Sequence, residues 1–422
     1  MNDMYSGPVT YLPRWLTPVL QAATDEHPVV VVTGARQTGK STLLLNADPF
    51  RDWRFLSLDD LAVLRQARDH PQALWAGSDH VVLDEVQRAP DLLSAVKLAV
   101  DRSGGRQRFA LSGSASLLLM SRVSESLAGR AVYIVLHPMT LGEMAGAAPP
   151  QVLEEALAGR LPEEGIALPP PDPVDLVLRG CMPALLTRHS SRAWTQWWDG
   201  YVTTYLERDL RQLSQIENLV DYRRLMELLA LRSAQLLNQS ELGRDAGLSQ
   251  PTVHRYLNLL ETSHLLTRLP SWLGNRSARL MKTPKAFWSD PGLAAYLSGY
   301  YDTDSLRSAR ELGALFETFV CHHVRVLAGL MTPPARVYFW RTRAGTEVDF
   351  VVEHGRRLVA IEVKMADAVT YRNAAGLRTF LDQYPQANAG LLLYAGNAVR
   401  HLGEKIVALP WTMITGGAPS PT

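Results

Sequence analysis

The feature of this sequence that most constrains its fold is a glycine-rich segment, GARQTGKST, over residues 34–42. The segment matches the pattern G-x-x-x-x-G-K-[ST], and an apolar run over residues 28–32 precedes it. An apolar strand, a glycine loop and a helix in this order form the setting in which such a loop binds phosphate. The backbone N–H groups of the loop and the positive end of the helix then face the anion. The sequence therefore predicts a nucleotide-binding loop, and the alternative is a glycine-rich turn between a core strand and a helix.

The residue types in this loop suit ATP and Mg²⁺. Gly34 and Gly39 allow the backbone to close on a triphosphate. Lys40 would reach the β- and γ-phosphates, and the Ser41 hydroxyl would bind Mg²⁺. ATP and Mg²⁺ are therefore the expected cofactors. The loop residues expected to contact the nucleotide are Gly34, Ala35, Arg36, Gln37, Thr38, Gly39, Lys40, Ser41 and Thr42.

A second segment, HVVLDE at residues 80–85, is an apolar strand that ends in two acidic residues. Asp84 would bind Mg²⁺ through water, and Glu85 would orient and deprotonate the water that attacks the γ-phosphate. The alternative is an acidic pair of the kind that often ends a strand. We place the loop and this pair at the ends of neighbouring parallel strands, where together they indicate a site of ATP hydrolysis.

Three further polar residues are candidates for this site. Ser112 or Ser114, at the end of the next strand, would touch the γ-phosphate or the attacking water, and an ordinary turn serine is the alternative. Arg130, just before the fifth strand, would reach the nucleotide of a neighbouring subunit and stabilise transition-state charge. A surface ion pair is the alternative for Arg130. The role of Arg130 on a neighbour, together with the fold, leads us to expect a homo-oligomer.

The 422 residues are too many for one hydrophobic core, so we expect two or three domains. Residues 1–145 alternate short apolar strands with helices, which predicts a P-loop α/β domain whose parallel sheet has helices on both faces. Residues 146–235 are predicted as a connector and a helical region. The strands predicted in the first domain are Val29–Thr33, Arg54–Ser57, His80–Leu83, Arg108–Ser112 and Val132–Leu136.

Residues 236–289 are predicted to form a winged helix-turn-helix. A helix, a tight turn and a second helix would be followed by two strands that pair as the wing. These elements are predicted at Leu236–Ala246, residues 247–249, Gln250–Glu261, His264–Leu269 and Leu280–Phe287.

A basic stretch overlaps the predicted wing. Residues 263–289 contain no acidic residue and several basic ones, which favours contact with the phosphates of DNA over a merely solvated face. Winged helices also serve as protein-binding modules and as lids of ATPases, so these alternatives stay open. The residues expected to contact DNA are Gln250, Thr252, His254 and Arg255 at the start of the second helix, with Arg276, Arg279 and Lys282 in the basic stretch.

Residues 290–422 return to an α/β pattern, with a helix and then three strands predicted at Glu311–Leu330, Val337–Arg341, Glu347–Glu353 and Leu358–Lys364. Asp349 on one alternating strand and Glu362-Val363-Lys364 on the next have the arrangement of PD-(D/E)XK nucleases. The sequence therefore predicts a restriction-endonuclease-like α/β domain.

The carboxylates of this domain would form a second metal site. Asp349 and Glu362 would hold Mg²⁺, and Lys364 would polarise the attacking water. Glu317, on the preceding helix, would add a further carboxylate. The alternatives are a solvated cross-strand pair of charges and an inactive fold retained for binding nucleic acid.

Composition limits the compartment more than the function. The net charge of +1 does not by itself indicate nucleic acid. Only Cys181 and Cys321 are present, which favours a reducing, cytoplasmic setting without a disulfide scaffold. Neither a secretory signal nor a membrane span is expected, because no basic-then-apolar leader and no run of about 18 apolar residues occurs. Cys321-His322-His323 lies on a predicted helix, where adjacent side chains point apart, so we interpret these residues as packing.

The motifs named so far, with later ones, resemble a known family. The glycine loop, VVLDE, LSGSASLL, ESLAGRA and HPMTLGE resemble AAA-type ATPases of bacteria and archaea that carry a C-terminal DUF4143 region. YLERDL (residues 205–210), KTPKAFWSDPGL and GALFETFV resemble that region too. The resemblance covers nearly the whole chain and implies an AAA+-like ATPase fused to an endonuclease-like domain. One departure is RGCMPALL at residues 179–186, where the family usually has two glycines before Tyr-Pro.

Three functions are compatible with these observations. The first is an ATP-regulated nuclease that acts on DNA, including branched or foreign DNA. The second is an ATP-driven DNA motor or remodeller whose nuclease-like domain only grips DNA. The third is a nucleotide-dependent switch that binds a protein partner. The basic stretch favours the first two.

Overall fold

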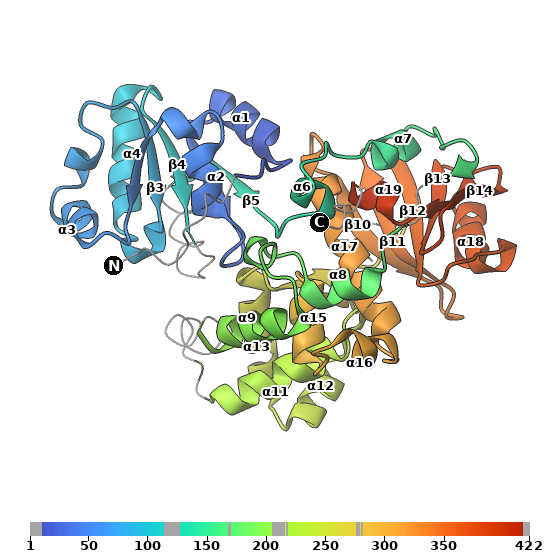
Figure 1. Ribbon diagram of the computed structural model, residues 1–422. Coiled ribbons are helices and arrows are strands. Elements are labelled where there is room, and N and C mark those ends of the chain that lie inside the picture. The colour runs from blue at the N-terminus through green and yellow to red at the C-terminus, as the bar shows by residue number, and fades with distance from the viewer. Residues whose placement is uncertain are drawn as a thin grey trace. The chain divides into compact units, whose positions relative to one another are not determined.

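The computed structural model describes residues 11–113, 127–167, 170–204, 216, 218–275, 279 and 282–416 (Figure 1). These residues divide into two compact units, which we describe separately. The first unit comprises Met1–Gly34 and Gly39–Leu136, and the second comprises Ala35–Thr38 and His137–Thr422. Ser114, Arg276 and the YLERDL segment lie outside the described residues. The predicted boundaries at residues 145, 235 and 289 stay predictions.

The first unit is built on a five-stranded parallel sheet in the order β2-β3-β4-β1-β5. Its strands are β1 (Val29–Thr33), β2 (Arg54–Ser57), β3 (His80–Asp84), β4 (Arg108–Ser112) and β5 (Ala131–Val135). Each predicted strand is confirmed to within one residue at either end. These strands could be predicted from sequence because they are short apolar runs, as is typical of strands that are covered on both faces.

Helices cover both faces of this sheet, as predicted. They are α1 (Thr17–Glu26), α2 (Lys40–Asn46), α3 (Leu61–Asp69) and α4 (Leu92–Ser103). Alternate residues of each strand point to opposite faces, so Val29 and Val31 join a core with α3 and α4. Val30 and Val32 join a second core with α1 and α2. Figure 1 shows the sheet between these two helix layers.

The strand order corrects one expectation. β4 lies between β1 and β3, because Val32 pairs with Ser112 and Leu83 pairs with Leu111. The glycine loop and the Asp-Glu pair therefore do not end neighbouring strands. Apolar periodicity identifies a strand but carries no information about which strands pair, so the order could not be predicted in this way.

The second unit begins with short helices, α6 (Leu141–Met144), α7 (Val152–Leu157), α8 (Pro173–Arg179) and α9 (Ser191–Tyr201). α8 packs against two later helices, α15 (Pro291–Leu297) and α16 (Thr303–Arg307). The approach to α15 is close: a Cβ added to Gly292 would lie 2.7 Å from the Arg179 carbonyl oxygen. Only a glycine fits there without a shift of the backbone.

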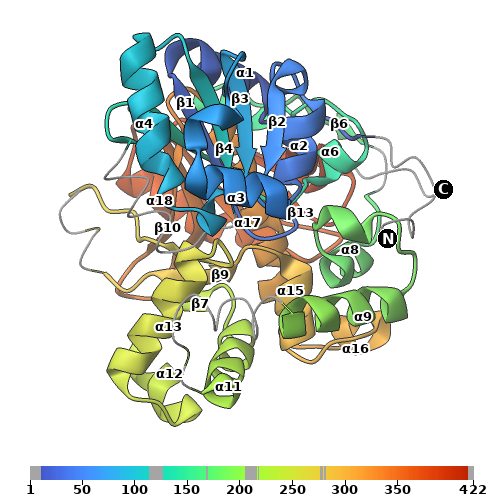
Figure 2. The same ribbon diagram turned by 90° about the vertical axis from the view of Figure 1, so that its left-hand side faces the viewer.

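In its described residues, the middle of the second unit has three named helices and a small antiparallel sheet. In chain order these are α11 (Leu219–Ala230), β7 (Gln235–Leu236), α12 (Gln239–Ala246), α13 (Gln250–Thr262), β8 (Leu266–Leu269) and β9 (Lys285–Trp288). The sheet order is β7-β9-β8. Figure 2 shows the three helices grouped beside this sheet.

The turn between α12 and α13 follows from three residues. Asn238 and Ser249 cap the two helices by accepting hydrogen bonds from backbone N–H groups, and Gly247 adopts a φ of 70° between them. The predicted second helix is confirmed. The first helix begins three residues later than predicted, because Leu236 pairs with Lys285 as part of β7.

The rest of the second unit is a seven-stranded sheet in the order β10-β11-β12-β13-β15-β14-β6. The strands are β10 (Arg336–Arg341), β11 (Glu347–His354), β12 (Arg357–Lys364), β13 (Ala389–Tyr394), β14 (Ala398–Gly403), β15 (Ile406–Pro410) and β6 (Gly165–Ile166). The helices are α17 (Leu312–Leu330), α18 (Ala375–Gln383) and α19 (Thr412–Thr415). The predicted helix and three predicted strands are confirmed to within one residue at each end.

A β-bulge interrupts the alternation expected around Asp349. Tyr338 pairs with Val351 and Trp340 pairs with Val348, so Asp349 and Phe350 together lie opposite one residue of β10. Such a bulge redirects side chains and raises the local twist. As a result Val348 and Val351 both enter the core with α18, while the Asp349 carboxylate lies near α17.

Among the described residues, no helix is long and apolar enough to cross a membrane.

Candidate functional site

The glycine loop joins β1 to α2 through three residues with positive φ. Gly34 has a φ of 145°, Gln37 a φ of 64° and Gly39 a φ of 93°. Gly39 directly precedes α2 as its N-cap residue, and a side chain there would strain the backbone. The Thr38 hydroxyl donates a hydrogen bond of 3.0 Å to the Ala35 carbonyl and supports the turn from within. The loop thus has the sharply curled backbone that a phosphate-binding loop requires.

Lys40 is the first residue of α2, and its side chain lies over the loop. The Nζ atom donates a hydrogen bond of 3.2 Å to the Gly34 carbonyl oxygen, and the residue is only 6% exposed. Burying an ammonium group costs free energy unless the group has partners, so the burial of Lys40 indicates a role for its charge at the loop. Ser41 follows in the first turn and is half-buried, while Thr42 is exposed.

Asp84 and Ser112 meet at the carboxyl ends of β3 and β4. The Ser112 hydroxyl donates a short hydrogen bond to Oδ1 of Asp84, and both residues are buried. This contact exists because β4 is inserted between β1 and β3. Ser112 therefore orients Asp84, and direct contact of Ser112 with the γ-phosphate stays a prediction.

Glu85 follows β3 with an unusual backbone. Its φ is 57°, a left-handed conformation that costs free energy for a residue with a Cβ and that tends to occur at functional sites. Burial raises the pKa of Glu85 above its ordinary value, although a short hydrogen bond from the Gln87 amide opposes the rise. A carboxyl group with a raised pKa is a better proton acceptor, as a general base must be.

Arg130 does not lie at the loop of its own chain. It precedes β5, and its carbonyl oxygen accepts a hydrogen bond from the N–H of Val29, at the start of β1. The loop is at the opposite end of that strand. The guanidinium forms a two-bond ion pair with Asp101, with distances of 2.6 and 3.0 Å. Action on a neighbouring subunit stays a prediction for Arg130.

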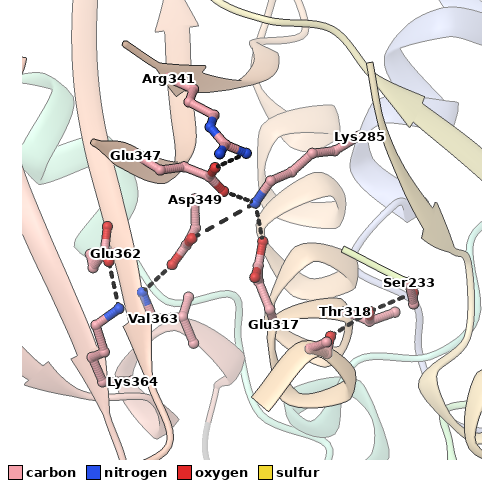
Figure 3. Close-up of polar contacts among 11 residues, drawn as sticks. Ser233, Lys285, Glu317, Thr318, Arg341, Glu347, Asp349, Glu362, Val363 and Lys364 are labelled. Carbon is pink, nitrogen blue, oxygen red and sulfur yellow. Dashed lines mark hydrogen bonds and ion pairs between the residues drawn. The ribbon is translucent and has the colours of Figure 1, made fainter. Parts of the chain in front are cut away.

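A charged cluster forms where α17, β9, β11 and β12 meet (Figure 3). Nζ of Lys285 lies 3.0 Å from Oε1 of Glu317 and 3.9 Å from Oδ1 of Asp349, and it forms a short ion pair with Glu347. Oδ2 of Asp349 accepts a hydrogen bond of 2.8 Å from the N–H of Val363. We call Glu317, Glu347, Asp349 and Glu362 the carboxylate cluster.

The side chains of Glu362 and Lys364 lie side by side on β12, because residues two apart in a strand point to the same face. Nζ of Lys364 donates a hydrogen bond of 2.6 Å to Oε1 of Glu362. Burial, followed by the neighbouring charge of Asp349, raises the pKa of Glu362 to about 8. The same two causes raise the pKa of Glu317 to about 8.

The predicted second metal site is not formed by these carboxylates. Within the described ranges, no group of three or more His, Cys, Asp or Glu residues is spaced to hold a metal ion. The cation that contacts both Glu317 and Asp349 is the ammonium of Lys285. Sequence reasoning assigned Lys285 to the basic stretch and overlooked Glu347. The signal it missed was that Lys285 opens the strand KAFW, whose other residues are all apolar.

The predicted DNA-contacting residues differ in how far they are exposed. Gln250, His254 and Arg255 are exposed on α13, and Lys282 is exposed before β9. Thr252 is half-buried, and its hydroxyl lies 2.9 Å from that of Ser249 within the helix cap.

Arg279 does not fit the predicted role. It is only 6% exposed, and its guanidinium forms a two-bond ion pair with Glu353 at 2.8 and 3.2 Å. The same group packs on the rings of Trp272 and Tyr338 at 4.9 and 5.0 Å from the centroids. The prediction that Arg279 binds DNA is therefore wrong. Its ion pair with Glu353 joins Arg279 to β11 of the C-terminal sheet.

The Cys321-His322-His323 segment of α17 is buried and serves packing. Nδ1 of His323 donates to the Phe319 carbonyl at 2.8 Å, and Nε2 accepts from the N–H of Leu141 at 3.1 Å. Nε2 of His322 donates to the Met139 carbonyl at 3.3 Å. These two histidines therefore join α17 to the segment that leads into α6.

The loop, the Asp84–Ser112 pair and the Glu85 carboxylate define a P-loop ATPase, and family models agree. An AAA domain model, AAA_14, matches residues 26–145. Two domains of unknown function, DUF8612 and DUF4143, match residues 171–304 and 312–414.

Two relatives extend this agreement over the chain. The uncharacterized proteins Rv2008c of Mycobacterium tuberculosis and Mb2031c of Mycobacterium bovis are each 33% identical over 392 residues. The match covers 93% of this chain and 82% of theirs. The chain belongs to this family of AAA-type ATPases with a C-terminal DUF4143 region.

Solved structures are more distant. The Walker-type ATPase PABY2304 of Pyrococcus abyssi is 15% identical, with a TM-score of 0.43, over 67% of this chain and 94% of its own. Protein VC1899 of Vibrio cholerae is 10% identical, with a TM-score of 0.18, over 92% of this chain and 95% of its own.

Proposed function

We propose that this protein couples Mg²⁺-dependent ATP hydrolysis to the binding and remodelling of DNA. The observation that carries the hydrolytic part is Glu85, a half-buried carboxyl held in a left-handed backbone beside Asp84. Lys40 would bind the β- and γ-phosphates, and Glu85 would accept a proton from the attacking water. These groups all belong to the carboxyl-terminal edge of one parallel sheet, where α/β proteins bind ligands.

The donor set at this edge fits Mg²⁺. Ser41 supplies a hydroxyl in the first turn of α2, and Asp84 supplies a carboxylate that Ser112 holds in place. Oxygen atoms of these two kinds are the ligands that Mg²⁺ prefers. When bound, Mg²⁺ would offset the negative charge of the phosphates.

The DNA part of the proposal is supported by residues 219–288. The order α11-β7-α12-α13-β8-β9 supports a winged helix-turn-helix, in which α13 would take the place of the recognition helix. Gln250, His254 and Arg255 are exposed on α13 and suit contacts with a groove and its phosphates.

Of the functions considered, remodelling is favoured over cleavage. Glu317 and Asp349 contact Lys285, so they do not offer the paired carboxylates that a metal-dependent nuclease needs. The endonuclease-like domain would then grip DNA or a partner rather than cut it. A protein-binding switch would be indicated if the tests below show no response to DNA.

DNA binding can be tested on α13 directly. The double variant His254→Ala/Arg255→Ala should weaken the binding of a fluorescent 30-base-pair duplex at low salt by at least tenfold, because two groove-facing contacts are lost. The matched control is Arg400→Ala, which removes an exposed charge from β14. Equal affinity of the double variant and the wild type would remove α13 from the proposal.

We also propose a homo-oligomer in which Arg130 acts on the nucleotide of a neighbouring subunit. The support is indirect: Arg130 is remote from its own loop, and it is partly exposed on the surface of its unit. Sedimentation with a non-hydrolysable ATP analogue should show an assembled species. A monomer at every concentration would contradict this part.

A further inference from the structure

Lys285 is a buried cation placed among acidic groups from two other elements. The residue is only 3% exposed on β9. It contacts Glu317 of α17 and both Glu347 and Asp349 of β11 (Figure 3). Burial alone would lower the pKa of this lysine, but the three carboxylates raise it above its ordinary value. The side chain therefore stays a cation.

The position of this ammonium bears on metal binding. A divalent ion that bridged Glu317 and Asp349 would need carboxylate oxygens within roughly 2.0–2.6 Å. Nζ of Lys285 lies 3.0 Å from one of these carboxylates and 3.9 Å from the other, so it occupies the space between them. A metal ion there would overlap with the ammonium and would be repelled by its charge.

We propose that Lys285 is the resident cation of the carboxylate cluster and that it excludes divalent metal ions from it. While β9 pairs with β8, the C-terminal region assembles no metal-dependent cleavage centre. The lysine instead ties the small sheet beside α13 to α17 and β11. This proposal is independent of the nucleotide site, so it can fail while the ATPase proposal stands.

A second observation shows that the cluster is short of positive charge. Glu362 is 8% exposed, and its Oε2 atom is buried without a hydrogen-bond partner. Its other oxygen, Oε1, accepts a hydrogen bond from Nζ of Lys364. An unsatisfied carboxylate oxygen in a core is costly, and the neutral, protonated form reduces that cost. The four carboxylates of the cluster thus face three cations, Lys285, Lys364 and Arg341.

The cluster should therefore accept a metal ion once Lys285 is removed. Lys285→Met keeps the length and the apolar stem of the side chain but removes its charge. We expect nucleotide-free Lys285→Met protein to bind one more Mn²⁺ per chain than wild type, measured by electron paramagnetic resonance of free Mn²⁺. The double variant Lys285→Met/Asp349→Asn should lose this additional site, because a carboxylate ligand is gone.

Two controls make the result specific. Lys282→Met removes an exposed lysine three residues away and should bind Mn²⁺ as the wild type does. Lys285→Met that is folded by circular dichroism yet binds no extra Mn²⁺ would overturn the proposal. If Lys285→Met does not fold, wild type is compared with Asp349→Asn. Equal Mn²⁺ binding by these two supports exclusion, and a lower value for Asp349→Asn overturns it.

Discussion

At the scale of single residues, Glu85 carries two free-energy costs that other interactions in the fold must offset. A left-handed backbone costs of the order of 1–3 kcal/mol for a residue with a side chain. Burial of its carboxyl group adds a desolvation penalty, which the raised pKa reflects. Both costs fall on the residue assigned to proton abstraction, as is common where catalysis requires a fixed geometry.

Glu85→Gln should separate binding from hydrolysis. Glutamine keeps the size and polarity of the side chain but cannot accept a proton, so phosphate release should fall by roughly 10²–10⁴-fold. ATP affinity, measured with a fluorescent analogue, should change less than threefold. Lys40→Ala is the contrasting variant and should lose both ATP binding and ATP hydrolysis. Hydrolysis by Glu85→Gln at the wild-type rate would exclude Glu85 as the base.

His323 supplies a second prediction at this scale. Its ring is neutral in the fold, because Nδ1 donates to a carbonyl and Nε2 accepts from an N–H. Burial lowers the pKa of His323 to about 4. The unfolded chain, with a pKa near 6.5, binds this proton more readily than the folded chain between pH 6.5 and 4. The contribution of His323 to stability is therefore lost as the pH falls through this window.

His323→Leu should reduce the acid sensitivity of the fold. Between pH 7.5 and 5, the loss in free energy of unfolding should be about 2 kcal/mol smaller than in the wild type. At pH 7.5 the variant should be less stable by about 1–3 kcal/mol, because the Leu141 N–H loses its acceptor. The measurement is urea unfolding at both pH values.

The control for this prediction is His189→Leu, which removes an exposed histidine of the same unit. Glu317, Glu362 and Asp290 have raised pKa values and act with the opposite sign, since the folded state holds their protons longer. They are present in every protein compared, so they cancel in the difference. An unchanged pH dependence in His323→Leu would contradict the account.

At the scale of elements, the described residues between β8 and β9 contact the C-terminal sheet. Ser271 bridges to Phe339 of β10, and the Trp272 ring packs against Phe380 of α18. Arg279 and Lys285 then form ion pairs with Glu353 and with the carboxylate cluster. Arg279 and Lys285 thus neutralise acidic residues of α17 and of the C-terminal sheet.

Arg279→Ala should therefore affect stability and not DNA affinity. Breaking a buried ion pair from one side costs about 3–5 kcal/mol, because the remaining charge stays buried. Urea unfolding followed by tryptophan fluorescence should show this loss, whereas Lys282→Ala should leave the transition unchanged. A variant of wild-type stability with weakened DNA binding would restore the original prediction for Arg279.

The turn at Gly180 explains the departure from the usual motif of the family. Gly180 has a φ of 83°, and a Cβ there would lie 2.3 Å from Oδ1 of Asp290. Cys181 follows without a positive φ, and its N–H donates to the other oxygen of Asp290 at 2.9 Å. One glycine is thus required by geometry, and the second position accepts a small buried side chain.

Elements proved more predictable from sequence than their contacts. Strands such as Val29–Thr33 and helices such as Leu312–Leu330 follow from local apolar periodicity, which sequence displays directly. The insertion of β4 beside β1, the bulge at Asp349 and the ion pairs of Lys285 depend on residues far apart in the chain. No local pattern encodes these contacts, so the sequence alone predicts a metal site at the carboxylates and DNA contact at the basic residues.

At the scale of the whole molecule, the chain combines an ATPase unit with a second unit that holds both α13 and the C-terminal sheet. The hydrolytic residues belong to the first unit, and the exposed residues of α13 belong to the second. If ATP hydrolysis drives work on DNA, contact at α13 must change the rate at the nucleotide site. If DNA also changes the affinity for nucleotide, linkage requires nucleotide to change the affinity for DNA by the same factor.

The most direct test of the account is phosphate release from ATP with and without DNA at low salt. We predict Mg²⁺-dependent hydrolysis that linear, single-stranded or four-way DNA stimulates severalfold. The His254→Ala/Arg255→Ala variant should keep the basal rate and lose the stimulation, and Glu85→Gln should lose both. Hydrolysis that none of the three DNA forms changes would contradict the coupling to DNA, and a wild-type protein without any hydrolysis would contradict the central claim.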